Sequence, residues 1–118
     1  MAKSINIVRI PVEGAVEFIE TPTDTLAEDI HEFVAGYFQC IPLRDGVYLW
    51  VNDDGKLIGL DPNPTAQRLW DAVYGAGSDY VVGNAILTGG ADRHGNTLGL
   101  NADATAYLQG FFTGVARG

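Results

Sequence analysis

The segment from Val47 to Val51, Val-Tyr-Leu-Trp-Val, is the most β-prone stretch of the chain, and a glycine-containing turn signal flanks it on each side. Arg44-Asp45-Gly46 precedes it, and Asn52-Asp53-Asp54-Gly55 follows it. Asp-Gly pairs accept the positive φ angles of tight hairpin turns, so both flanks predict chain reversals. Together with residues 37–43 and 56–60, the pattern predicts a three-stranded antiparallel meander.

Further strands are predicted on both sides of this meander. Residues 5–12 and 15–19 alternate apolar and polar side chains, and the short gap between them predicts a first hairpin. Residues 80–88 predict a mostly buried strand, which Gly83-Asn84 interrupts. Residues 97–100 predict a short return strand after a glycine-rich loop.

Three segments carry helix signals. Thr25-Leu26-Ala27-Glu28 has the form of a capping box, and Gly36 is placed to end that helix in a left-handed conformation. Asn63 predicts an N-cap with Pro64 at the first helical position, and Asn101 predicts the cap of a last helix. Each helix has an apolar face, formed by Leu26, Ile30, Phe33 and Val34, by Ala66, Leu69, Trp70 and Val73, and by Tyr107, Leu108, Phe111, Phe112 and Val115.

These elements predict an α+β fold, with a mainly antiparallel sheet of about five or six strands and two or three packed helices. A length of 118 residues fits one domain, which we expect to span residues 1–118. The predicted core consists of Ile7, Phe18, Ile30, Phe33, Ile41, Leu49, Val51, Leu69, Trp70, Val82, Ile86, Leu108 and Phe112.

Charge and hydropathy argue against nucleic acids and membranes as binding partners. A formal net charge of −8 repels the phosphates of DNA and RNA, so we expect no direct nucleic-acid binding. The sequence has no run of about 18 apolar residues, which predicts no membrane association. The N-terminus lacks an apolar signal segment and Cys40 is the single cysteine, so we expect a cytoplasmic protein.

No motif predicts catalysis, a metal site or a cofactor. His31 and His94 are interpreted as solvated surface residues, and Cys40 as a small core residue. Asn52-Asp53-Asp54-Gly55 lacks the spacing of a calcium loop and is better explained as a hairpin turn. Because no nucleophile–base pair can be identified, an enzyme ranks third among the functional hypotheses.

The first hypothesis is protein binding through an acidic segment. Seven carboxylates occur between positions 13 and 32, with no Lys or Arg among them. A solvated face is one reading, and a surface for a basic protein partner is the other. The segment contains Glu13 and the six predicted binding residues Glu17, Glu20, Asp24, Glu28, Asp29 and Glu32.

The second hypothesis is binding of a small ligand, such as a nucleotide-like signal, in a polar pocket. The candidate residues are Tyr37, Gln39, Asn52, Lys56, Asn63 and Asn84. A concave pocket with converging polar groups would favour a ligand, whereas a flat surface beside an acidic ridge would favour a protein. Assembly of the chain into a homo-oligomer remains open.

The central region resembles the bacterial and phage family of unknown function numbered 3846. The resembling segments are Gly36-Tyr37-Phe38-Gln39-Cys40-Ile41-Pro42, Val51-Asn52-Asp53-Asp54-Gly55-Lys56, Leu60-Asp61-Pro62-Asn63 and Asp79-Tyr80-Val81-Val82-Gly83-Asn84. Their order and spacing carry the resemblance, which covers residues 28–88. The chain departs from the family pattern in its first hairpin and its long last helix. The resemblance implies a small protein common on phage genomes and mobile elements, and it implies no catalytic activity. For a phage-encoded accessory protein, the first hypothesis becomes binding of a host protein in the host cytoplasm.

Overall fold

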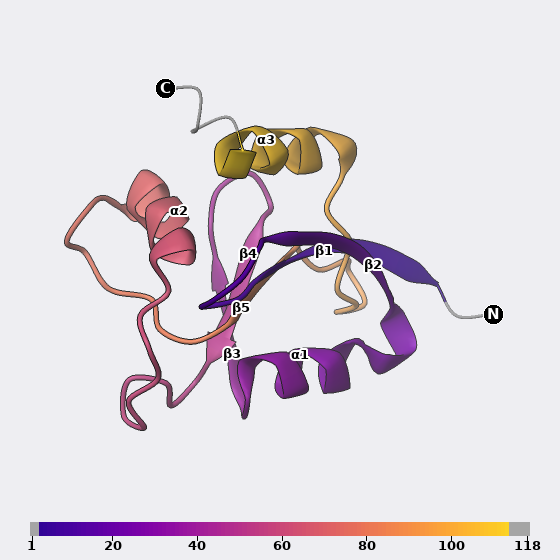
Figure 1. Cartoon of the computed structure of the whole chain (residues 1–118). Coiled ribbons are helices and arrows are strands. Elements are labelled where there is room, and N and C mark those ends of the chain that lie inside the picture. The colour runs from indigo at the N-terminus through magenta and orange to yellow at the C-terminus, as the bar shows by residue number, and fades with distance from the viewer. Residues whose placement is uncertain (1–2, 114–118) are drawn as a thin grey trace.

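Five strands form one antiparallel sheet in the computed structural model, which describes residues 3–113 (Figure 1). The sheet order is β2-β1-β5-β4-β3, so β2 and β3 are the two edge strands. The elements in chain order are β1 (Ser4–Ile10), β2 (Glu17–Pro22), α1 (Leu26–Val34), β3 (Phe38–Pro42), β4 (Tyr48–Asn52), α2 (Pro64–Tyr74), β5 (Ala85–Thr88) and α3 (Ala102–Thr113). The predicted α+β class is therefore confirmed. None of the helices in residues 3–113 has the length and apolar character needed to cross a membrane.

Helices cover both faces of the sheet. Helix α1 packs on one face, and α2 and α3 pack on the other (Figure 1). In β5, Ile86 faces α1, whereas Ala85 and Leu87 belong to the cluster under α2 and α3. Successive side chains of a strand point to opposite faces, so a central strand covered on both sides buries both sets of its side chains. This explains why all four residues of β5 are buried.

Both predicted hairpins at the sheet edges are present. Strands β1 and β2 pair with Ile7 opposite Ile19, which confirms the first hairpin. Strands β3 and β4 are joined by a turn in which Asp45 and Gly46 have φ angles of 57° and 75°. The backbone N–H of Leu43 donates to the carbonyl oxygen of Val47 at 2.7 Å and closes this turn.

The third strand of the predicted meander is absent, so the prediction for residues 56–60 was wrong. Residues 53–59 form consecutive turns, and Leu57 is 88% exposed. The first of these turns is held by the Asn52 side chain, whose Oδ1 accepts from the backbone N–H of Asp54 at 2.8 Å. Strand β4 pairs with β3 on one side and with the fully buried β5 on the other. Neither side of β4 is therefore left for residues 56–60 to pair with.

The helix starts at Asn63 and Asn101 are confirmed. The Oδ1 of Asn63 accepts from the backbone N–H of Ala66 at 3.0 Å, and the Oδ1 of Asn101 accepts from that of Ala104 at 2.8 Å. In the N-cap geometry, such a side-chain oxygen satisfies a backbone donor that has no partner within the helix.

The capping box predicted at Thr25 does not form. Residues Thr23–Thr25 already make a 3-10 turn, so Thr25 lacks the extended backbone of an N-cap and its hydroxyl donates to Asp29 instead. At the other end of α1, the left-handed residue is Ala35, with φ 68°, rather than Gly36. A Cβ on Gly36 would lie 2.8 Å from Asn52 Nδ2, so the close approach of that side chain is what requires glycine.

The late strands are shorter than predicted. Strand β5 begins only at Ala85, after Gly83, whose φ is 78°. Residues 97–100 form an isolated bridge between Thr97 and Ala91 and no strand. Leu98 bonds to the glycine-rich loop, where the Gly89 N–H donates to its carbonyl oxygen at 2.9 Å, whereas the Leu100 N–H donates to the carbonyl oxygen of Asn6 in β1 at 2.9 Å.

The predicted core is confirmed, with small differences in burial. Leu108 of α3 is buried, Tyr107 is exposed, and Val115 lies outside the described residues. The buried members are Ile7, Ile30, Leu49, Val51, Leu69, Val82, Ile86 and Leu108, and the half-buried ones are Phe18, Phe33, Ile41, Trp70 and Phe112.

Candidate functional site

The seven carboxylates of the acidic segment are all exposed, and we call them together the acidic surface. They come from consecutive elements: the β1–β2 connection, the edge strand β2, the 3-10 turn and α1. The Thr21 hydroxyl of β2 donates to Asp29 Oδ2 of α1 at 2.8 Å and ties these elements together. The members are Glu13, Glu17, Glu20, Asp24, Glu28, Asp29 and Glu32.

Most of the acidic surface is not neutralised within the described chain. Arg9 Nη2 lies 2.7 Å from Glu17 Oε1, the one ion pair that this surface makes within residues 3–113. Asp29 accepts hydrogen bonds from the hydroxyls of Thr21 and Thr25. In the same part of the chain, no side-chain hydrogen bond or ion pair is made by Glu13, Glu20, Asp24, Glu28 or Glu32.

The acidic surface also borders an open strand edge. Within residues 3–113, β2 pairs with β1 alone, so its outer side offers backbone N–H and C=O groups without a neighbouring strand. Charged side chains on such an edge discourage pairing with another strand of the same charge. A partner segment that approaches β2 therefore has to tolerate the charge of Glu17 and Glu20.

The six residues predicted to form one polar pocket do not come together. Gln39, Asn52 and Lys56 line a cavity of about 390 Å³ beside β3 and β4, which we call the polar cavity. Tyr37 is 78% exposed and packs against His31, with their ring centroids 5.9 Å apart. Asn63 and Asn84 are not among the residues that line this cavity.

The three asparagines of that set hold backbone segments together. Asn52 Nδ2 donates to the carbonyl oxygens of Val34 and Ala35, at the end of α1. Asn63 is completely buried. Asn84 donates to the carbonyl oxygen of Phe33 at 3.1 Å and accepts from the N–H of Val12 at 2.8 Å. Buried backbone groups need such partners, so these amides connect the helices to the sheet.

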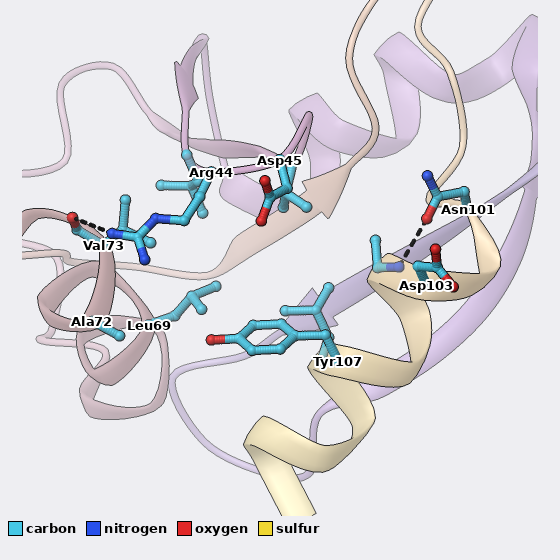
Figure 2. Close-up of a pocket in the computed structure, with 12 residues that line it drawn as sticks. Arg44, Asp45, Leu69, Ala72, Val73, Asn101, Asp103 and Tyr107 are labelled. Atoms are coloured by element: carbon cyan, nitrogen blue, oxygen red, sulfur yellow. Dashed lines mark hydrogen bonds between the residues drawn. The ribbon is translucent and has the colours of Figure 1, made fainter.

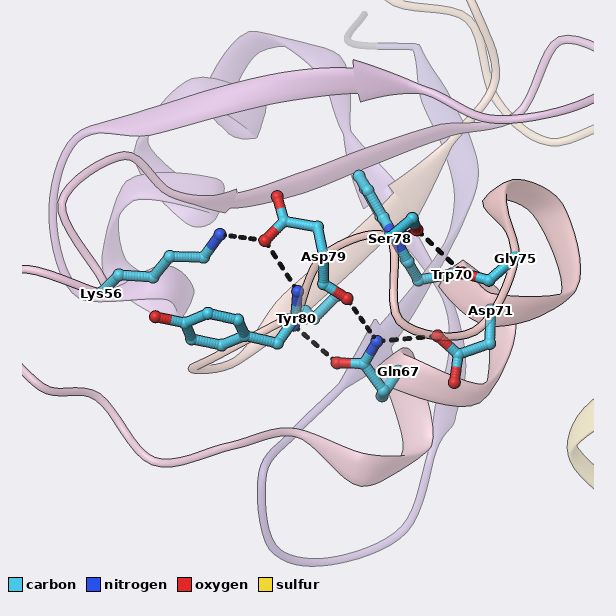
Figure 3. A network of polar contacts seen from close by, with 9 residues as sticks. Lys56, Gln67, Trp70, Asp71, Gly75, Ser78, Asp79 and Tyr80 are labelled. Carbon is cyan, nitrogen blue, oxygen red and sulfur yellow. Dashed lines mark hydrogen bonds and ion pairs between the residues drawn. The ribbon is translucent and has the colours of Figure 1, made fainter.

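A polar network borders the polar cavity (Figure 3). Lys56 Nζ lies 2.5 Å from Asp79 Oδ1 and 4.4 Å from the centre of the Tyr80 ring. The side chain of Gln67 donates to the carbonyl oxygen of Asp79 and accepts from the N–H of Val81. The hydrogen bond from Lys56 lowers the pKa of Asp79 below its usual range, with help from the Tyr80 N–H. The charged groups of the network therefore already satisfy one another.

A larger cavity, of about 480 Å³, lies between α2, α3 and the β3–β4 turn, and we call it the interhelical cavity (Figure 2). None of its residues was singled out from the sequence as a site residue. They come from three segments far apart in the chain, and the turn and cap signals at Asp45 and Asn101 carry no information on their proximity. The lining residues are Leu43, Arg44, Asp45, Val47, Leu69, Ala72, Val73, Asn101, Asp103, Ala104, Tyr107 and Leu108.

The single cysteine is not a core residue, so that prediction was wrong. Cys40 is exposed because β3 is an edge strand and its residue 40 points away from the main core. Desolvation by its neighbours raises the pKa of the thiol. His31 and His94 are exposed, as predicted, and His31 Nδ1 lies 2.7 Å from the carbonyl oxygen of Gly36. Within residues 3–113, no group of three His, Cys, Asp or Glu side chains is arranged to hold a metal ion.

Comparison with known proteins gives one match. A family model described as "Domain of unknown function (DUF3846)" matches residues 5–113. The matched segment is longer than residues 28–88 and includes the first hairpin and the last helix, which we expected to depart from the family. No curated protein and no solved structure matches the chain.

Proposed function

The chain belongs to the DUF3846 family of domains of unknown function, and we propose that it acts by binding a basic protein through its acidic surface. The observation that carries this proposal is that five of the seven exposed carboxylates have no ionic or hydrogen-bonding partner within residues 3–113. We propose a host protein as the partner, on the ground that the sequence resembles proteins common on phage genomes and mobile elements.

Electrostatics supports this choice. Glu28 and Glu32 lie one turn apart on α1, where like charges repel and weaken the helix slightly. A cationic partner surface would relieve this repulsion and would be attracted over a distance of about 10 Å at about 0.1 M salt. Complementary charge of this kind raises the association rate more than it slows dissociation.

The open edge of β2 supports a definite mode of contact. An extended segment of the partner could pair with the outer backbone groups of β2, as peptides do when they add a strand to a sheet. Lys or Arg side chains on that segment would then meet Glu17 and Glu20 on the strand and the carboxylates of α1. A neutral or acidic segment would be repelled at the same edge.

Binding of a nucleotide-like ligand in the polar cavity ranks second. The concave shape of that cavity favours it, with Gln39, Asn52 and Lys56 among the lining residues. However, the ammonium group of Lys56 is already paired with Asp79, and Asp53 adds a further carboxylate to the lining. A phosphate would have to displace Asp79 from its only cation there.

The test is capture of a partner from a bacterial lysate, followed by association kinetics with the purified partner at two salt concentrations. The screening length falls from about 10 Å at about 0.1 M salt to about 3 Å at about 1 M. Our proposal expects a basic partner and an association rate that drops strongly between these conditions. A partner whose association rate is indifferent to salt would reject the acidic surface and put ligand binding first.

A further inference from the structure

The interhelical cavity combines an apolar floor with a polar rim. Its floor is made by Val47 of the β3–β4 segment, Leu69 of α2 and Leu108 of α3, all of them buried. The Tyr107 ring reaches from α3 towards Leu69 and Ala72 on α2, and so forms one wall (Figure 2). Cavities of roughly 300–1,000 Å³ with apolar walls and a few polar groups are typical small-molecule sites, and this one measures about 480 Å³.

Two of the polar rim groups are already engaged. Arg44 Nη2 donates to the carbonyl oxygen of Val73 near the end of α2, at 3.3 Å. Asn101 uses its Oδ1 to cap α3. Figure 2 shows both of these contacts on opposite sides of the cavity. Each contact uses only part of its side chain, and the guanidinium of Arg44 still brings one positive charge to the rim.

The remaining rim groups are two carboxylates and a phenol. Asp45 and Asp103 make no ion pair, and neither they nor the Tyr107 hydroxyl make a side-chain hydrogen bond within residues 3–113. Asp45 is held at the mouth by the β3–β4 turn, and Asp103 by the first turn of α3. With Arg44 the rim therefore carries one positive and two negative charges, and this net charge favours a cation over an anion.

We propose that the interhelical cavity binds a small organic amine, whose ammonium group binds at the rim that carries Asp45 and Asp103 and whose apolar body lies against Tyr107 and the floor. Charge-assisted hydrogen bonds from an ammonium to carboxylates are among the stronger polar contacts. An ammonium group that lies over the face of the Tyr107 ring also gains a cation–π interaction. Transfer of the apolar body from water onto Val47, Leu69 and Leu108 is favourable through the hydrophobic effect. This site is separate from the acidic surface, so it can be tested independently of the proposed function.

The test compares three probes that share a phenyl ring and a short chain: phenethylamine, 2-phenylethanol and 3-phenylpropionate. Each is titrated into the full chain and followed by the NMR signals of Tyr107 and Leu108. We expect saturable binding of the amine, and binding about tenfold weaker or worse for the alcohol and the carboxylate. Equal binding of all three probes, or no saturable binding of the amine, would overturn the proposal.

Variants locate the site. Asp45→Asn combined with Asp103→Asn should weaken amine binding about tenfold and bring it to the level of the alcohol. Ala72→Leu should block the cavity for all probes, because Ala72 lines it from an exposed helix position. Ala106→Leu is the matched control, being exposed on α3 and outside the lining. Melting curves confirm that each variant is folded, and unchanged amine binding in folded Ala72→Leu protein would contradict the assignment.

Discussion

Asn63 Nδ2 donates to the carbonyl oxygen of Ile10 at 2.9 Å, so the residue that caps α2 also bonds the end of a strand 53 residues earlier in the chain. The same amide nitrogen donates to the carbonyl oxygen of Gly83 at 2.9 Å. Its Oδ1 accepts from the N–H of Ala66. One buried side chain thus satisfies three backbone groups from three separate segments.

Replacing this side chain should therefore cost more than the loss of an ordinary cap. An N-cap residue contributes about 1 kcal/mol, and each buried backbone group left without a partner costs about 1–3 kcal/mol. We expect Asn63→Ala to lower the free energy of unfolding by about 3 kcal/mol or more, measured by urea denaturation. The exposed cap variant Asn101→Ala should lose only about 1 kcal/mol.

Asn63→Asp separates the two roles of this residue. Aspartate is as good an N-cap as asparagine, but it cannot donate to Ile10 and Gly83 and places a charge in a fully buried position. Asn63→Asp should therefore be destabilised at neutral pH at least as strongly as Asn63→Ala. A stability close to that of the wild type would show that the cap alone matters.

Removing unpaired carboxylates should slow partner binding without harming the fold. The change Glu20→Gln, Glu28→Gln and Glu32→Gln takes three charges from the acidic surface and leaves the Arg9–Glu17 pair intact. We expect a lower association rate with the captured protein, a dissociation rate that changes less, and a weaker salt dependence.

A charge-matched control makes that result specific. Asp53→Asn, Asp54→Asn and Asp61→Asn remove three exposed charges that lie outside the acidic surface. This control should associate at nearly the wild-type rate. If both triple variants slow association equally, net charge rather than the acidic surface is responsible.

Cys40 should react with a thiol reagent in the native protein, because its side chain is exposed on the edge strand β3. Its pKa is raised, so less thiolate is present near neutral pH than for a free cysteine, and the native rate should rise as the pH increases. The measurement is labelling with an aromatic disulfide reagent at several pH values, native and unfolded. Labelling that begins only on unfolding would place the thiol in the interior after all.

The Lys56–Asp79 pair should give a small pH-dependent term in stability. The pKa of Asp79 is lowered in the folded state, so its contribution is present above the ordinary aspartate pKa of about 3.9 and is lost as the pH falls through the lower folded value. Because both side chains are more than a third exposed, the effect is modest. Lys56→Gln should therefore lower stability slightly at pH 6, and its difference from the wild type should shrink as the pH falls below the ordinary aspartate pKa of about 3.9.

Carboxyl carbon NMR provides the direct measurement. In Lys56→Gln protein the pKa of Asp79 should move up towards its ordinary value, without reaching it, because the Tyr80 N–H still donates to the carboxylate. Asp92 serves as an internal control, since its lowered pKa is due chiefly to the backbone N–H of Asn96. An unchanged titration of Asp79 would mean that Lys56 does not hold this carboxylate in solution.

The acidic surface was the part of the candidate site that could be predicted from the sequence. Its carboxylates follow one another along the chain, and the hairpin edge and helix that carry them leave all seven exposed. The polar pocket was predicted only in part, because polarity alone does not distinguish Lys56, which faces the polar cavity, from Asn63, which is completely buried. The interhelical cavity could not be predicted, because its walls meet only when α2 and α3 pack on the same face of the sheet.

By itself, the sequence determined the local features: the turn at Asp45-Gly46 and the helix starts at Asn63 and Asn101. Each of these depends on backbone conformations and hydrogen bonds within a few residues, which residue type controls directly. Only the tertiary structure decided that β5, and not residues 56–60, pairs with β4. It also decided that Asn63 reaches Ile10 and that Asp45 lies across a cavity from Tyr107. These outcomes depend on which arrangement buries most apolar surface over the whole chain, a sum that no local pattern contains.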